Sequence, residues 1–210
     1  MKAIKNILFG LCLVAAASCN NQNNEENTAM KEDNAVIETI MSRRSIRKYK
    51  DQPVDREVLN KILECGVNAP NGQNKQSWEV RVVDSPELMA EMKRAVIKGH
   101  PDMPAEMAEG CFRGAPVMVF IARDTTYPFS AYDCGLLAEN IVLSAWSLGV
   151  GSICLGSPVF FLSDNEACKP YLERLDFSEG YELCLCVGLG YADETPEAKP
   201  RDMKKVRFIE

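Results

Sequence analysis

Residues 117–155 read VMVFIARDTTYPFSAYDCGLLAENIVLSAWSLGVGSICL. The first six residues are all apolar, which is typical of a strand buried on both faces. Residues 132–148 carry the strongest helical pattern of the chain, since only Asp133, Glu139, Asn140 and the serines are polar. We expect this helix in the centre of the protein or in a subunit interface, followed by a buried strand at 150–155.

Helices and strands alternate on both sides of this stretch. Helical spacing predicts helices at 36–43, 55–67, 87–98 and 164–172, and apolar or alternating runs predict strands at 78–83 and 183–189. The helix after Asp55, its predicted N-cap, should end before Pro70 because a residue that precedes proline avoids the helical region. This order of elements predicts an α/β or α+β fold, with helices packed on a sheet.

Composition narrows the range of functions. The 210 residues suit one domain, and 24 Lys and Arg against 30 Asp and Glu give a net charge of −6. Without an extended basic block, this acidic balance argues against nucleic acid as a partner. The lone His100 is a weak basis for a metal site or a Ser-His-Asp triad. Nine Cys without a CxxC pair suggest neither a disulfide framework nor a zinc ribbon.

Two of the cysteines lie only two positions apart in the sequence. Cys184 and Cys186 alternate on the predicted strand at 183–189, so both side chains should point to one face of the sheet. The simplest interpretation is that they pack as small hydrophobic residues. A vicinal redox pair is the alternative.

The N-terminus has the pattern of a signal peptide, predicted for residues 1–18. Lys2 and Lys5 precede an apolar run at 7–17, which is shorter than the ~20 residues that span a bilayer. The following Ala16-Ala17-Ser18-Cys19 resembles a bacterial lipobox, which implies lipidation of Cys19 and export to the periplasmic or surface side of a membrane. The alternative is plain secretion, with cleavage near Ala17. Either cleavage removes Lys2 and Lys5, leaving 22 basic against 30 acidic residues, a net charge of −8.

A polar stretch separates this leader from the predicted folded domain at 35–210. Residues 20–34 read NNQNNEENTAMKEDN and hold too few apolar residues to build a core. Together with Cys19 they are expected to form a flexible tether between the lipid anchor and the domain. Several acyl chains at Cys19 would anchor the protein stably, whereas one chain binds a membrane only marginally.

Two polar segments stand out within the predicted domain. Residues 43–50, RRSIRKYK, place five cations in eight residues. They suit either the solvated end of a helix or a phosphate site, because Arg binds phosphate oxygens bidentately. Residues 68–78, NAPNGQNKQSW, form an amide-rich loop. It either reads the polar edge of a heteroaromatic ring or is a turn closed by its own Asx bonds.

Taken together, these segments resemble the FMN-dependent nitroreductase family. The family's R-R-S-x-R-x-[FY] opening appears at 43–49, and its A-P-S-x-x-N-x-Q-P-W signature appears at 69–78 with Asn71 and Ser77 as departures. The resemblance continues at 133–135, 148–152, 188–191 and 199–201, so it covers almost all of residues 36–201. It implies an α+β fold with a nitroreductase-like mixed central sheet flanked by helices, working as a homodimer.

The resemblance also implies the cofactor FMN and its binding residues. Arg43, Arg44, Ser45 and Arg47 would hold the phosphate, ribityl chain and pyrimidine edge, and Lys199 and Arg201 would add a late basic pair on the phosphate. Pro70, Asn71, Gly72 and Asn74 would be contributed across the dimer interface. Ile153, Cys154, Leu155 and Gly156 would cover one face of the ring, with the N–H of Leu155 approaching flavin N5.

The implied activity is hydride transfer from NAD(P)H, or another donor, through FMN to a nitroaromatic or quinone by a ping-pong mechanism. No catalytic side chain or metal ligand is assigned, because the flavin itself performs the chemistry. A narrower flavin reaction, dehalogenase-like or oxidase, is one alternative. A flavin-binding or electron-relay lipoprotein without turnover is another. An exported member must also acquire FMN and find a donor outside the cytoplasm, where NAD(P)H is not normally available.

Overall fold

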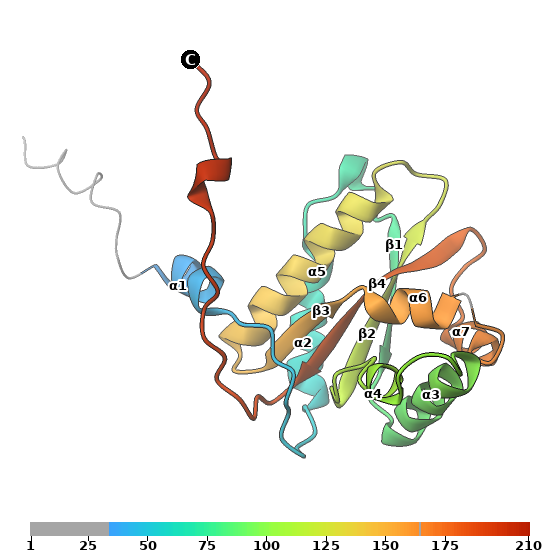
Figure 1. The fold of residues 1–210 in the computed structure, drawn as a ribbon. Helices are drawn as coiled ribbons and strands as arrows, with labels where there is room; N and C mark the ends of the chain where they lie inside the picture. The colour runs from blue at the N-terminus through green and yellow to red at the C-terminus, as the bar shows by residue number, and fades with distance from the viewer. Residues whose placement is uncertain (1–33, 164) are drawn as a thin grey trace, which may run out of the picture. The chain divides into compact units, whose positions relative to one another are not determined.

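A four-stranded antiparallel sheet organises the computed structural model, which describes residues 34–163 and 165–210 (Figure 1). Its strand order is β1-β2-β4-β3, with β1 at Trp78–Val83, β2 at Val117–Asp124, β3 at Gly151–Leu155 and β4 at Tyr181–Gly190. The central strand β2 is the apolar run of the sequence, and its first six residues are all buried. The predicted signal peptide, Cys19 and almost all of the tether lie outside the described residues.

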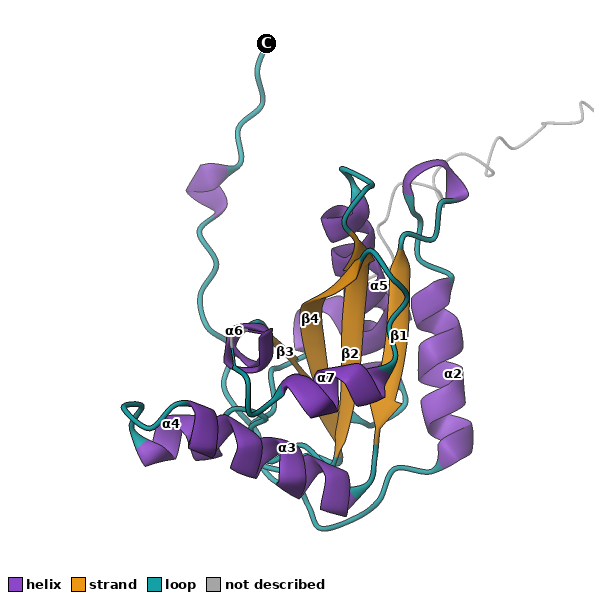
Figure 2. Cartoon of the chain, turned by 90° about the vertical axis from the view of Figure 1, so that its right-hand side faces the viewer, coloured by secondary structure: helices purple, strands orange, loops and turns teal. Residues whose placement is uncertain are grey.

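Helices cover both faces of the sheet, as Figure 2 shows. On one face, α2 (Arg56–Val67) and α5 (Ser130–Ser147) bury Leu59, Ile62, Leu137 and Ile141. The other face carries α3 (Pro86–Gly99), α4 (Ala105–Glu109), α6 (Ser157–Ser163) and α7 (Lys169–Leu175). Helix α1 (Ala35–Ser42) contacts α5, and two 3₁₀ turns lie at Gly72–Asn74 and Met203–Lys205. None of the helices in the described ranges has the length and apolar character that crossing a membrane requires.

The predicted α+β class is confirmed, and most predicted elements lie within two residues of the observed ones. The helix predicted at 164–172 is wrong in its bounds, since α7 begins at Lys169 with Pro170 in its first turn, a position that suits proline. Helices α4 and α6 were not predicted. With five and seven residues respectively, they are too short to display a helical period.

Helix α5 leads directly into the edge strand β3. Its C-terminal residues form a Schellman motif, in which Val150 N–H donates to Ala145 O at 2.8 Å and Gly149 N–H donates to Trp146 O at 3.0 Å. Gly149 has φ 75°, a left-handed conformation that side chains disfavour. The glycine therefore turns the chain sharply enough for β3 to start two residues later.

A β-bulge overturns the prediction for Cys184 and Cys186. Ile121 pairs with Leu185 and Ala122 pairs with Leu183, so Cys184 is an extra residue without a partner of its own. Cys184 packs on the α2–α5 side of the sheet, whereas Cys186 is fully buried on the opposite side. The expectation of a shared face fails because the extra residue breaks the two-residue period of the strand.

Candidate anion-binding site

The basic segment that follows α1 runs along the free edge of β3. Ser45 forms an isolated parallel bridge with Ser152, and Ile46 N–H donates to Ser152 O at 2.9 Å. This bridge adds a parallel pairing to the antiparallel strands. Ile46 is 1% exposed and lies against Gly151, where a Cβ would come within 2.8 Å of Ile46 Cγ1. Glycine at 151 therefore allows the segment its close approach.

The other end of the segment is fastened to the continuation of β4. Lys50 N–H donates to Tyr191 O at 2.9 Å, and the Tyr49 hydroxyl donates to Ile46 O at 2.8 Å. Burial raises the pKa of Tyr49, so this donor keeps its proton. A Cβ on Gly190 would lie 2.7 Å from Tyr49 Cδ1, so this glycine too accommodates the segment. The main chain of the segment is thus fixed on both sides.

The basic residues of the segment line a cavity of about 440 Å³ together with the C-terminal tail. Its lining comprises Ile40, Met41, Arg43, Arg44, Ser45, Arg47, Pro196, Glu197, Ala198, Lys199 and Arg201. The structure therefore brings together the four residues predicted for the phosphate, ribityl chain and pyrimidine edge and the late basic pair predicted for the phosphate, although about 150 positions separate the two groups. Sequence reasoning missed the lining at Ile40, Met41 and 196–198, which carries no motif.

No cation of this cavity forms an ion pair within the described part of the chain. The four ion pairs found there involve Arg56, Lys61, Arg81 and Arg123, none of which lines the cavity. The Arg44 guanidinium donates to the carbonyl oxygens of Met41 and Arg43 at 2.8 Å. Glu194 faces the main chain, accepting hydrogen bonds from the backbone N–H groups of residues 47 and 48. Five cations and one carboxylate, Glu197, line a cavity suited to an anion.

The segment predicted to cover the ring lies on the same strand edge. Ile153 and Leu155 are buried towards α3–α7, Cys154 is exposed, and Gly156 is the first residue after β3. Surrounding protein nevertheless desolvates the Cys154 thiol and raises its pKa, while Arg43 acts in the opposite direction.

The amide-rich loop lies near the start of α5, whereas the basic segment lies near the end of the same helix (Figure 1). Gly72 N–H donates to Asp133 at 2.9 Å near the start of α5. Near the end of α5, Trp146 Nε1 donates at 2.8 Å to Ser42, which directly precedes the basic segment. A helix rises ~1.5 Å per residue, so these two points are roughly 20 Å apart. One chain alone does not bring Pro70, Asn71, Gly72 and Asn74 to the cavity.

Asp133 fixes the conformation of this loop. Its carboxylate is 2% exposed and accepts from Gly72 N–H at 2.9 Å and from the Ser77 hydroxyl at 2.6 Å. Three residues without glycine's freedom have positive φ, namely Gln73, Asn74 and Gln76. The sequence showed Asp133 only as a polar exception on an apolar helix, and this role was missed. The sequence signal that pointed to this role was the position of a carboxylate in the first turn of an otherwise apolar helix.

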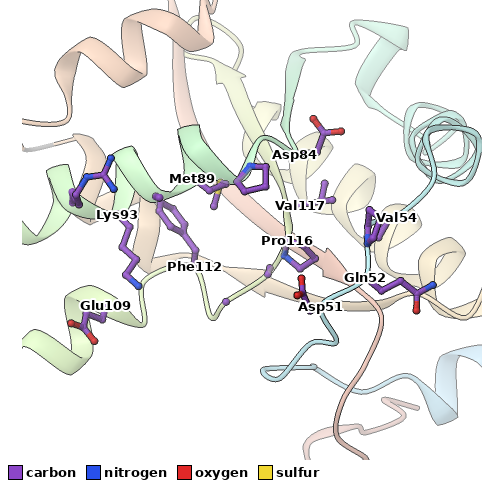
Figure 3. Close-up of a pocket in the computed structure, with 16 residues that line it drawn as sticks. Asp51, Gln52, Val54, Asp84, Met89, Lys93, Glu109, Phe112, Pro116 and Val117 are labelled. Atoms are coloured by element: carbon purple, nitrogen blue, oxygen red, sulfur yellow. The ribbon is translucent and has the colours of Figure 1, made fainter.

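A larger cavity of about 670 Å³ lies elsewhere, between the end of β1, the start of β2 and α3 (Figure 3). None of the predicted cofactor residues lines it. Its charged residues are of both signs, with Lys93 and Arg94 against Asp51, Asp84 and Glu109, and Asp84 pairs with Arg56 at 2.7 Å. Size alone would select this cavity, but the smaller one has the charge that an anion requires.

The fold and the site together define an α+β protein with a cationic cavity along the edge of its sheet. Comparison with known proteins gives the particular family. The chain belongs to the Nitroreductase family, whose model matches residues 40–191. The resemblance predicted from the motifs is therefore confirmed.

Solved relatives share the fold over nearly their whole length. A nitroreductase with bound FMN from Desulfitobacterium hafniense is 33% identical, covers 84% of this chain and 99% of its own, and has a TM-score of 0.76. A nitroreductase with bound FMN from Bacteroides fragilis is 26% identical, covers 84% of this chain and 100% of its own, and has a TM-score of 0.75. Among curated proteins, an NADPH-flavin oxidoreductase of Vibrio harveyi is 30% identical over 174 residues, which are 80% of this chain and 70% of that protein.

Proposed function

We propose that this chain is an FMN-dependent oxidoreductase that binds the cofactor phosphate in the cationic cavity. The convergence on one cavity of five cations, none of which forms an ion pair within the described residues, carries the proposal. A phosphate monoester with a charge of about −1.5 to −2 matches such a site. The cavity volume also lies within the range of roughly 300–1,000 Å³ that small-molecule sites occupy. Both FMN-bound relatives have this fold.

Each predicted residue then has a role that its position suits. Arg43, Arg44, Lys199 and Arg201 would hold the phosphate, and Ser45 would add a hydroxyl donor. Arg47 would lie at the pyrimidine edge, where a cation holds the negative charge that reduction brings and raises the reduction potential. Residues 153–156 would cover the ring, with the N–H of Leu155 towards N5. Bound FMN would supply the transfer of two electrons, and the chain would orient the reactants.

The separation of the two half-sites supports a homodimer. Residues 70–74 lie roughly 20 Å along α5 from the basic segment, so a partner chain must supply them if they are to reach the cofactor. A surface for that partner is available on the outer side of α5, on α1 and on the tail. Its exposed apolar residues are Ile40, Met41, Tyr132, Leu136, Met203, Val206, Phe208 and Ile209. A surface of this kind typically marks a protein interface.

The proposed reaction is a ping-pong transfer from NAD(P)H, or another donor, to a nitroaromatic or quinone acceptor. The NADPH-flavin oxidoreductase of Vibrio harveyi supports a nicotinamide donor. The alternatives are a dehalogenase-like or oxidase reaction, or an electron relay without turnover. These functions share the cofactor site and differ in the partners that react there.

Anaerobic titration of the purified full-length protein with FMN tests this proposal. We expect a yellow protein that sediments as a dimer, is bleached by NAD(P)H and regains its colour with a nitroaromatic or quinone. A protein that takes up no flavin would refute the cofactor site. A yellow protein that no donor in a panel bleaches would instead favour the relay.

We further propose that the protein is exported and held on a membrane by acyl chains on Cys19. The supporting observations are the charged start, the short apolar run and the small residues before Cys19. Mass spectrometry of the mature protein should show an N-terminal peptide that begins at acylated Cys19. An intact Met1, or an unmodified Cys19, would contradict the anchor. An exported enzyme would require a donor available outside the cytoplasm.

A further inference from the structure

We propose that Cys134 and Cys184 form a reversible disulfide that joins α5 to β4. The β-bulge turns Cys184 towards the α2–α5 side of the sheet, the side on which Cys134 is fully buried. Cys134 Sγ lies 3.6 Å from the carbonyl oxygen of Ala122, the residue whose pairing with Leu183 borders the bulge. Both side chains therefore pack in the same core beside the bulge, Cys134 from α5 and Cys184 from β4.

The chemistry of the pair suits disulfide exchange. Interaction with the neighbouring Cys134 thiol lowers the pKa of Cys184, and the nearby Arg123 guanidinium acts in the same direction. A thiolate is the attacking species in thiol chemistry, and Cys184 is half-buried rather than enclosed. Cys134 stays neutral, because the interaction with Cys184 and burial both raise its pKa, and its thiol donates to the carbonyl oxygen of Ala122. One thiol is thus prepared to attack and the other to resolve.

The reaction requires an oxidant of the disulfide class, for which oxidised glutathione is the probe. The Cys184 thiolate attacks one sulfur of the probe, whose S–S bond breaks and releases one glutathione thiolate. Cys134 loses its proton and attacks Cys184 Sγ in the mixed disulfide, releasing the second glutathione. The two protein thiols lose two electrons and two protons, and these reduce the probe to two thiols.

Three other described cysteines of the domain offer a contrast. Cys111, Cys168 and Cys186 are buried on the opposite side of the sheet. Burial raises the pKa of Cys111 and Cys168 to about 11 and raises that of Cys186 as well, so these thiols stay protonated. Cys186 is therefore a matched control for Cys184, two residues away on the same strand but facing the other core.

The bond would also affect the amide-rich loop. Cys134 follows Asp133, which holds Gly72 and Ser77 by hydrogen bonds. A covalent link from Cys134 to β4 would fix the first turns of α5 and, through Asp133, the loop. This consequence for the cofactor site depends on the proposed function, whereas formation of the disulfide does not.

The experiment treats reduced full-length protein with oxidised glutathione, blocks the remaining thiols and digests with a protease that cleaves after glutamate. We expect the peptide that ends at Glu139 to be linked to the peptide that begins at Leu183. The melting temperature should rise by about 5–10 °C, and dithiothreitol should reverse the rise. Amide exchange at residues 71–77 should slow in the oxidised protein.

Cysteine variants test the assignment of the disulfide to Cys134 and Cys184, in an assay that contains no flavin. Cys186→Ala should retain the link, whereas Cys184→Ser and Cys134→Ser should each abolish it while the reduced proteins keep their spectra. Linkage that persists in Cys184→Ser, or glutathione that stays on Cys184 without resolution, would overturn the proposal. Since this assay needs no cofactor, a failure here is distinguishable from a failure to bind FMN.

Discussion

Replacing Arg43 and Arg44 together with alanine should weaken FMN binding by about 10²- to 10⁴-fold. Each hydrogen bond between a charged pair contributes roughly 1.5–3 kcal/mol, and two such bonds to the phosphate account for that range. Arg43 and Arg44 both line the cavity, and the Arg44 guanidinium also donates to the carbonyl oxygens of Met41 and Arg43. Fluorescence titration of the apoprotein with FMN measures the change.

Two matched variants show whether the loss belongs to the phosphate site. Arg174, in the last turn of α7, is exposed and outside the cavity, so Arg174→Ala should leave the FMN dissociation constant within about twofold of the parent value. Arg43→Lys with Arg44→Lys keeps both charges but not the guanidinium forks, and should recover only part of the affinity. Unchanged FMN retention in the double alanine variant would refute the assigned site.

The cation site could be predicted from the sequence because its residues carry local signals. The run at 43–50 is dense in charge on an acidic chain, and the motif at 199–201 could be matched to it by resemblance. The central strand β2 was equally clear, since six consecutive apolar residues leave little alternative to burial.

Features that depend on pairing between distant residues could not be predicted. The bulge at Cys184 exists only relative to its partners Ile121 and Ala122, so strand 183–189 in isolation suggests regular alternation. The role of Asp133 depends on Gly72, which lies 61 positions away and is unremarkable in the sequence. Both features arise from tertiary packing, on which local propensity and periodicity carry no information.

Asp133→Ala should destabilise the protein by about 3–5 kcal/mol. The carboxylate is buried and accepts two short hydrogen bonds, so its removal leaves the Gly72 N–H and the Ser77 hydroxyl without their acceptor. For a domain of this size the corresponding fall in melting temperature is about 10 °C. Urea unfolding followed by circular dichroism measures the free energy directly.

The loss of Asp133 should weaken FMN binding as well as stability, because Asp133 holds the loop at 71–77. Gln73, Asn74 and Gln76 have left-handed backbone conformations that persist only where the surroundings enforce them. Without Asp133 the loop should relax, so the variant should bind FMN more weakly even at temperatures where it is folded. Asp133→Asn is the matched control, since its amide oxygen can still accept from Gly72 and its NH₂ can donate to Ser77. If the alanine and asparagine variants unfold at the same urea concentration as the parent, Asp133 does not hold the loop.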